Sequence, residues 1–92
     1  MAYINKIGFY LPPTKRTNRD LNNSHPEWSV DKISKKTGIY QRSVSSINEF
    51  SSDMGVEAAE DLFSKGVDRE TVDYLIFCTQ SPDYLIPTTA CI

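Results

Sequence analysis

Residues 72–79 read Val-Asp-Tyr-Leu-Ile-Phe-Cys-Thr, and this stretch decides how the fold of the whole chain is interpreted. After Asp73 its side chains are apolar on both alternating faces, which is typical of a parallel-sheet strand that helices cover on both sides. The stretch therefore predicts an inner strand of an α/β protein, with Cys78 buried in its core.

The covering helix is predicted immediately before this strand. Between Ser51 and Gly66 the apolar side chains recur at helical spacing and form one stripe, which consists of Met54, Ala58, Ala59, Leu62 and Phe63. Ser51 or Ser52 is the expected N-cap, and Gly66 is expected to end the helix.

A second strand is predicted at residues 2–11, which are rich in Tyr, Ile and Phe and end at Pro12-Pro13. Gly8 within this segment indicates a bulge or the close approach of another backbone. Strand, long helix and strand in this order predict a βαβ unit with a right-handed crossover.

The polar region between these elements predicts two short helices and a short strand. Asn18 is expected to cap a helix over residues 19–24, and Ser29 to cap a second helix, which Gly38 ends in a left-handed conformation. Residues 39–47 are expected to contain the strand.

The two apolar strands have more surface than one amphipathic helix can cover. A further helix is predicted to begin at Pro87, a favoured residue of the first helical turn, yet only five residues follow it. We therefore expect residues 1–92 to be a partial N-terminal half-domain of a larger α/β protein, with the remainder of the fold supplied by further chain.

Length and composition exclude several classes of protein. A chain of 92 residues makes at most one small domain, and 39% hydrophobic with 24% charged residues is too apolar for a disordered protein. The longest apolar run, residues 75–78, is far shorter than the ~18 residues of a membrane span. No secretory signal pattern is visible, and two cysteines cannot form a disulfide framework, so we expect a cytoplasmic protein without a membrane partner.

The net charge of −2 conceals an asymmetry between the two halves of the chain. Residues 1–50 carry eight basic and four acidic residues, a net of +4, whereas residues 51–92 carry two and eight, a net of −6. The division indicates either a phosphorylated or acidic partner for the first half, or simply a basic surface and an acidic helix. The basic residues are too few and too dispersed to indicate a nucleic-acid partner.

Three cations, Lys35, Lys36 and Arg42, flank the segment Thr37-Gly38-Ile39. One interpretation is that they hold phosphate groups. The other is that they serve only the helix dipole and solubility. The spacing leaves both interpretations open.

Cys91 lies near the helix start predicted at Pro87, where backbone N–H groups lower a thiol pKa and create a nucleophile. The alternative is a small cysteine buried in the core. His25, the only histidine, has no partner at metal-ligand spacing. No catalytic carboxylate pair or phosphate-binding glycine loop is evident, so we expect no metal site and no cofactor.

Four stretches form a recognisable set in order and spacing across nearly all 92 residues. They are Ile7-Gly8-Phe9-Tyr10-Leu11-Pro12, Thr17-Asn18-Arg19-Asp20-Leu21, Lys36-Thr37-Gly38-Ile39-Tyr40-Gln41-Arg42, and the segment from Tyr74 to Cys91, which contains Ser81-Pro82-Asp83-Tyr84 and Pro87-Thr88-Thr89-Ala90-Cys91. Together they resemble the start of the 3-oxoacyl-[acyl-carrier-protein] synthase III family, in the thiolase superfamily. The resemblance implies a layered αβαβα fold, of which this chain is the first βαβ part, and a homodimer.

The resemblance also implies an activity, the decarboxylative Claisen condensation of an acyl-CoA with a malonyl thioester, with acyl-CoA and acyl-carrier protein as partners. In the family a cysteine takes up the acyl group, and a histidine and an asparagine assist the decarboxylation. None of these three residues lies within this chain, and Cys91 matches an Ala-Cys position in the helix before the nucleophile. The 92 residues alone are therefore expected to be inactive.

Binding residues are implied by the same resemblance. Lys36 and Thr37 match an Arg-Thr pair that holds CoA. Trp28 is the candidate for the tryptophan that stacks on adenine. It stands farther from Thr37 than the family's tryptophan does, and in this chain Ile33 falls at the matching position. Ile86 matches the residue that reaches into the partner subunit's acyl pocket.

Two other interpretations stay open. One is a specialised relative within the superfamily that forms quinolone, ester or polyketide products, which the longer spacing between Trp28 and Thr37 favours. The other is a non-catalytic dimerisation or binding module.

Overall fold

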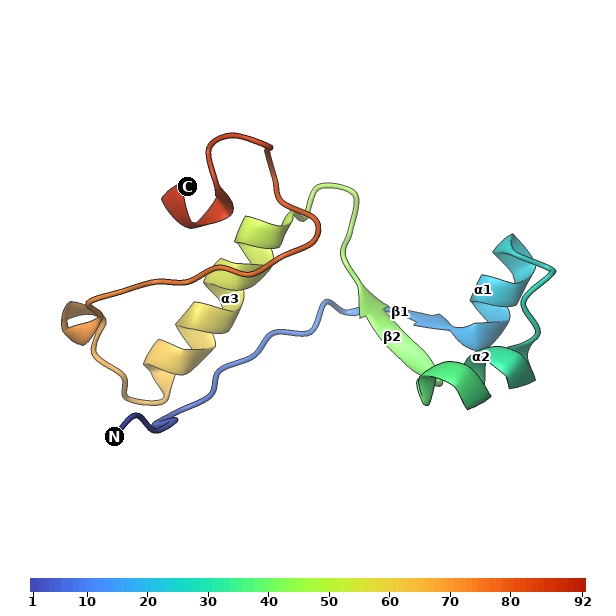
Figure 1. Ribbon diagram of the computed structural model, residues 1–92, viewed down its shortest axis with the longest axis horizontal. Coiled ribbons are helices and arrows are strands. Elements are labelled where there is room, and N and C mark those ends of the chain that lie inside the picture. The colour runs from blue at the N-terminus through green and yellow to red at the C-terminus, as the bar shows by residue number, and fades with distance from the viewer. The chain divides into compact units, whose positions relative to one another are not determined.

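The computed structural model describes residues 1–92, which form two compact units (Figure 1). The hairpin unit consists of Leu11–Ile47, and the α3 unit consists of Met1–Tyr10 together with Asn48–Ile92. Each unit contains helices, but only the hairpin unit contains strands.

The hairpin unit is built on two antiparallel strands, β1 (Thr14–Thr17) and β2 (Gln41–Val44). Their register places Thr14 opposite Val44. The strand predicted within residues 39–47 is confirmed as β2. Strand β1 was not predicted, because its sequence, Thr-Lys-Arg-Thr, shows no apolar alternation and its four residues are all exposed.

Helix α1 (Asn18–Ser24) begins one residue earlier than predicted, because Thr17 and not Asn18 is its N-cap. The Thr17 hydroxyl accepts the backbone N–H of Asp20 at 3.2 Å, and the Asp20 carboxylate accepts the backbone N–H of Thr17 at 2.7 Å. This reciprocal pair is a capping box. The hydrogen bonds from the Thr17 backbone and side chain hold the pKa of Asp20 below its ordinary value. Asn18 does not serve as the cap and is buried instead.

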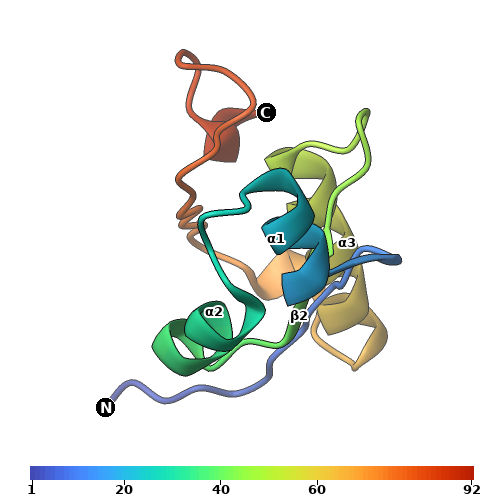
Figure 2. The same ribbon diagram turned by 90° about the vertical axis from the view of Figure 1, so that its right-hand side faces the viewer.

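Helix α2 (Val30–Thr37) confirms both predicted ends. The Ser29 hydroxyl accepts the backbone N–H of Lys32 at 3.1 Å, as an N-cap does. Gly38 follows the helix at φ 68°, in the left-handed region that favours glycine. Helices α1 and α2 are neighbours within the hairpin unit (Figure 2).

Helix α3 (Ser51–Ser64) confirms the longest predicted helix, and Gly66 follows it at φ 101°. The predicted serine cap is wrong, because Phe50 is the N-cap residue and its backbone N–H donates to the Asp53 carboxylate at 2.9 Å. The hydroxyls of Ser51 and Ser52 instead donate to residues 81 and 83, so they are not available to the helix end.

The two predicted strands, residues 2–11 and 72–79, form no sheet, and the expected βαβ ladder is absent from this chain. A strand needs a hydrogen-bonded neighbour, and neither segment has one here. Both segments instead run alongside α3 (Figure 1). A Cβ at Gly8 would lie 2.6 Å from the Ala58 carbonyl oxygen, which confirms the close backbone approach predicted there.

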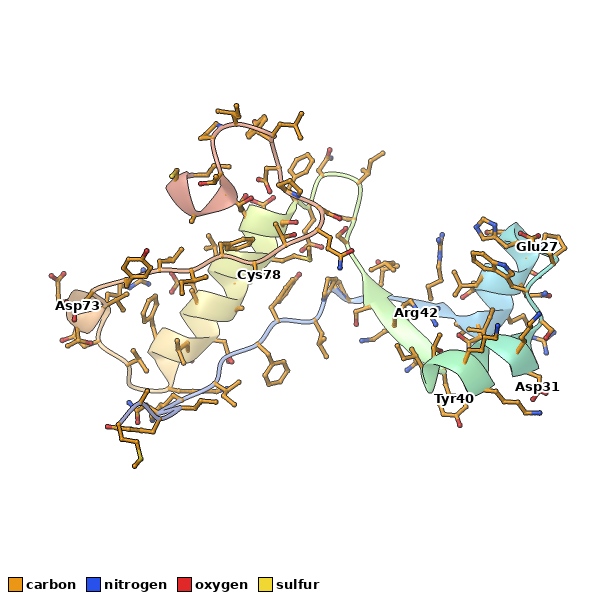
Figure 3. The ribbon with its side chains drawn as sticks, viewed as in Figure 1. Glu27, Asp31, Tyr40, Arg42, Asp73 and Cys78 are labelled. Atoms are coloured by element: carbon orange, nitrogen blue, oxygen red, sulfur yellow. The ribbon has the colours of Figure 1, made fainter.

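Pro12 is buried, but none of the larger apolar side chains of the chain is. Ile4 is 81% exposed on the first segment, and Ile76 is 84% exposed on the second. The prediction that Cys78 lies in the core is wrong, since it is exposed on the segment beside α3 (Figure 3). The physical reason is that a single helix covers only a part of each segment.

Two 3₁₀ turns, Arg69–Thr71 and Thr89–Cys91, complete the α3 unit. The helix predicted from Pro87 onward is therefore reduced to the second of these turns. None of the helices has both the length and the apolar character that a membrane-spanning helix needs.

Candidate functional site

The hairpin unit contains a pocket of about 390 Å³, hereafter the cationic pocket. Its lining residues are Leu21, Trp28, Lys32, Ile33, Lys36, Thr37, Ile39 and Arg42. Three of them are cations and none is acidic, while four present apolar side chains. The volume falls within the ~300–1,000 Å³ typical of small-molecule sites, and the charge favours an anionic ligand with an apolar part.

Helix α2 supplies one wall of the cationic pocket. Lys32 and Lys36 are four residues apart and so lie on one face of the helix, next to Ile33 and Thr37. Lys36 and Thr37 were predicted, whereas Lys32 was missed. Its spacing from Lys36 was the feature of the sequence that could have revealed it.

Lys35 does not line the cationic pocket, although the sequence grouped it with Lys36 and Arg42. Its ammonium group lies 3.1 Å from the Asp31 carboxylate, one turn earlier on the same helix. The helical rotation of 100° per residue separates Lys35 from Lys36 and explains the difference. Two of the three predicted cations therefore meet at the pocket.

Trp28 and Ile33, the residue at the position of the family's tryptophan, both line the cationic pocket. They occupy the positions of a hydrophobic staple at the start of α2. The Trp28 indole is 48% exposed and its ring lies 4.5 Å from the His25 ring, with an interplanar angle of 31°. The Asn22 amide donates to the Trp28 carbonyl at 2.6 Å, which holds the backbone of this residue.

The turn after α2 forms another side of the cationic pocket. The Thr37 hydroxyl donates to the Ile33 carbonyl at 2.7 Å and accepts the backbone N–H of Ile39 at 3.1 Å. Gly38 between them needs its left-handed backbone conformation. The segment Thr37-Gly38-Ile39 is thus a turn held by local hydrogen bonds.

Arg42 projects from β2, opposite Arg16 on β1 (Figure 3). Its Nη2 donates to the Asn18 side-chain oxygen at 2.7 Å, and its Nη1 donates to the Arg16 carbonyl at 3.3 Å. These bonds use two of the five N–H donors of a guanidinium. The sequence predicted Arg42 near the pocket but missed its partner Asn18.

The other predicted residues do not join this site. Ile86 is 89% exposed in the α3 unit and does not line the cationic pocket. Cys91 is the last residue of a three-residue 3₁₀ turn, so it does not occupy a helix N-terminus. It is also exposed, which contradicts its interpretation as a buried core residue. No group of three or more potential metal ligands occurs in the structure.

Sequence comparison finds relatives over nearly the whole chain. A β-ketoacyl-[acyl-carrier-protein] synthase III from Solibacter usitatus is 38% identical over 95 residues, which cover 99% of this chain and 28% of that protein. A protein of the same name from Chlamydia trachomatis is 41% identical over 90 residues, which cover 97% of this chain and 27% of that protein. No family model matches the chain.

Solved structures agree with these relatives. A crystal structure of a 3-oxoacyl-(acyl-carrier-protein) synthase III matches with a TM-score of 0.78 at 42% identity, covering 94% of this chain and 26% of that one. The β-ketoacyl-[acyl-carrier-protein] synthase III from Thermus thermophilus matches with a TM-score of 0.79 at 36% identity, covering 92% and 26%.

The fold is thus part of a thiolase-like α/β architecture, which confirms the predicted fold class. More narrowly, the chain resembles the N-terminal part of 3-oxoacyl-[acyl-carrier-protein] synthase III, as the four sequence stretches predicted. The chain spans just over a quarter of the length of these relatives.

Proposed function

We propose that this chain forms the N-terminal part of a cytoplasmic, homodimeric acyltransferase that condenses an acyl-CoA with a malonyl thioester held on acyl-carrier protein. The observation that carries the proposal is the likeness to proteins named synthase III over at least 97% of the chain, at 38–41% identity. In this proposal the cationic pocket is the part of the site that receives the nucleotide end of CoA.

The lining of the cationic pocket supports this ligand. The half-exposed Trp28 indole and the aliphatic side chain of Ile33 offer an apolar surface on which an adenine ring stacks. The phosphate groups of CoA are polyanions, and Lys32, Lys36 and Arg42 supply charge-assisted donors without a competing carboxylate. A free adenine, which has no phosphates, would contact the apolar surface of the pocket but would give its three cations no anionic partner.

In the proposed reaction, a cysteine thiolate attacks the acyl-CoA thioester and the CoA thiolate departs. Loss of CO₂ from the malonyl thioester then gives an enolate, which attacks the acyl-enzyme and releases the cysteine. The residues of this chain do not supply that nucleophile in the proposal. They hold the CoA part of the donor and so set its position relative to the thiolate.

The exposed apolar segments of the α3 unit support the proposal that further layers of a thiolase-like fold cover them. Ile4 and Ile76 leave more than four-fifths of their surface in solvent. Burying such side chains stabilises a protein by ~1.5–3 kcal/mol each. In the same proposal Ile86, exposed at 89%, reaches the acyl pocket of the partner subunit.

The proposal is tested by mass spectrometry of the protein at its natural length after incubation with a panel of acyl-CoAs. We expect a mass increase equal to one acyl group, with release of free CoA, followed by loss of that mass and evolution of CO₂ when malonyl-acyl-carrier protein is added. A protein that gains no mass with any acyl-CoA and releases no CO₂ contradicts the proposal. In that case CoA binding without acylation would identify the alternative, a binding module.

A specialised relative that forms quinolone, ester or polyketide products is a second candidate. The displaced position of Trp28 before α2, with Ile33 beside it in the same pocket, is the observation that favours it. Chromatography of the condensation products distinguishes the two, because the first candidate yields a 3-oxoacyl thioester and the second releases an ester or a cyclised product.

A further inference from the structure

Asn18 is one of the few buried residues of the chain, with 3% of its surface exposed. It is the first residue of α1, a helix that is otherwise exposed or half-buried. A polar side chain is buried stably only when its donors and acceptors are paired. The pairing of Asn18 therefore shows which parts of the hairpin unit it joins.

Every polar atom of the Asn18 side chain has a partner. Its Nδ2 donates to the Ile39 carbonyl at 2.8 Å and to the Ser34 hydroxyl at 2.9 Å. Its Oδ1 accepts from Arg42 Nη2 at 2.7 Å. Its backbone N–H donates to the Tyr40 carbonyl at 3.2 Å.

These partners settle the orientation of the Asn18 amide. The Ile39 carbonyl can only accept a hydrogen bond, and the Arg42 guanidinium can only donate one. A flipped amide would turn Nδ2 toward Arg42 and Oδ1 toward the Ile39 carbonyl, so both bonds would be lost. Only an asparagine-like group, with a donor on one side and an acceptor on the other, satisfies both partners.

Asn18 does not line the cationic pocket, but two of its hydrogen-bond partners do. Ile39 belongs to the turn after α2, and Arg42 belongs to β2. Lys32 and Lys36 reach the pocket from α2 on flexible stems, and neither ammonium group is held by a hydrogen bond to the protein. Arg42 is thus the pocket cation whose guanidinium a buried group holds in place.

We propose that Asn18 is a positioning residue of the cationic pocket, which fixes the Arg42 guanidinium and the turn at Ile39 in the geometry that receives a phosphate of CoA. The inference rests on the proposed function of that pocket. Asn18 acts through Arg42 and does not touch the ligand itself.

A double-mutant cycle tests this role by isothermal titration of CoA into the protein at its natural length. We expect Asn18→Ala to weaken CoA binding by about fivefold, because an unfixed guanidinium loses part of a charge-assisted bond. We expect Arg42→Ala to weaken it by about tenfold, and the double variant to be no weaker than Arg42→Ala alone within about a factor of two. Combining Asn18→Ala with Lys36→Ala should multiply the two separate effects.

Asn23→Ala is the matched control, because Asn23 lies on the same helix, is exposed and is outside the pocket. It should leave CoA affinity unchanged. Thermal unfolding of each variant separates lost stability from lost positioning, since a merely structural Asn18 would weaken binding equally with and without Arg42. That equal weakening, or an unchanged affinity in Asn18→Ala, overturns the inference.

The outcomes also separate this inference from the proposed function. Absence of CoA binding by the unaltered protein overturns both. Binding that Lys36→Ala weakens and Asn18→Ala leaves intact overturns the positioning role alone. If Asn18→Ala fails to fold, the milder Asn18→Ser takes its place in the same cycle. A weakening of CoA binding that disappears in the Arg42→Ala background supports the inference, and an equal weakening in both backgrounds overturns it.

Discussion

The hairpin unit and the α3 unit differ in what holds them together. In the hairpin unit, short polar elements are tied by hydrogen bonds that run through one buried asparagine, and a pocket forms among them. In the α3 unit, apolar segments lie against a single helix and leave most of their large side chains in solvent. The hairpin unit therefore satisfies its own polar groups, whereas the α3 unit has an apolar surface that its own residues do not cover.

The largest loss of stability is expected at Gly8, where the first apolar segment of the α3 unit approaches α3 closely. A side chain at Gly8 would collide with the Ala58 carbonyl oxygen at 2.6 Å and with Leu62 Cβ at 2.8 Å. We expect Gly8→Val to lower the free energy of unfolding by about 3 kcal/mol, the upper range for overpacking. Urea denaturation monitored by circular dichroism measures this change.

Gly38→Ala in the hairpin unit is the control for that substitution. A Cβ at Gly38 would meet nothing within 4 Å, but the φ of 68° would be strained. Its expected loss is about 1 kcal/mol. An equal or greater loss for Gly38→Ala would show that the segment around Gly8 is not packed against α3.

Within the hairpin unit, some features could be predicted from the sequence and others could not. Helix α2 was predicted with both ends, because Ser29 and Gly38 act within one turn of the backbone. Strand β1 and the burial of Asn18 were missed, because each depends on partners sixteen or more residues away. Polar residues give no periodic pattern from which such partners can be inferred.

In the α3 unit the wrong predictions came instead from segments whose apolar pattern is clear. The apolar pattern of residues 72–79 is real, but a strand also requires a neighbouring strand, which the 92 residues do not provide. For the same reason Cys78 was predicted in a core and is exposed. In the pocket, Trp28, Lys36 and Thr37 were predicted, whereas Lys32 was overlooked although its helical spacing placed it there.

The second largest effect is expected at the cationic pocket. We expect Lys36→Glu to raise the KM for acyl-CoA by about tenfold with little change in kcat, because the substitution replaces a phosphate partner with a repelling charge. Steady-state kinetics of the protein at its natural length and at low salt measures the change. Lys35→Glu makes the same charge reversal one residue away, outside the pocket, and should leave the KM unchanged. Similar KM values for the two variants would remove Lys36 from the site.

A smaller effect is expected at the start of α1. Thr17→Ala removes the hydroxyl that accepts the Asp20 N–H, and we expect the free energy of unfolding to fall by about 1 kcal/mol. Thr14→Ala, at the exposed other end of β1, is the matched control and should change stability by less than about 0.5 kcal/mol. Chemical denaturation of both variants decides whether the capping box stabilises the hairpin unit.

The smallest effect is a loss of stability when the pH is lowered, and we expect it in both units. Side-chain hydrogen bonding by Lys65, together with the Phe9 N–H, lowers the pKa of Asp61, as Thr17 lowers the pKa of Asp20. A carboxyl whose folded pKa lies below its unfolded value of 3.8 stabilises the folded state above that value. The stabilisation should therefore be present from neutral pH down to about 3.8, and be lost as the pH falls further through the lowered pKa values.

Melting temperatures measured at intervals from neutral to strongly acidic pH test this expectation. Asp61→Asn should flatten part of the acid-induced decline by removing the contribution of the α3 unit, and Asp20→Asn should do so for the hairpin unit. Asp20 is exposed and the Asp61 side chain is 34% exposed, so each effect should shrink when salt is added. If neither variant alters the slope of melting temperature against pH, these carboxylates do not link protonation to folding, and the order of the hairpin unit rests on the hydrogen-bond network of Asn18 and Arg42, which does not titrate in this range.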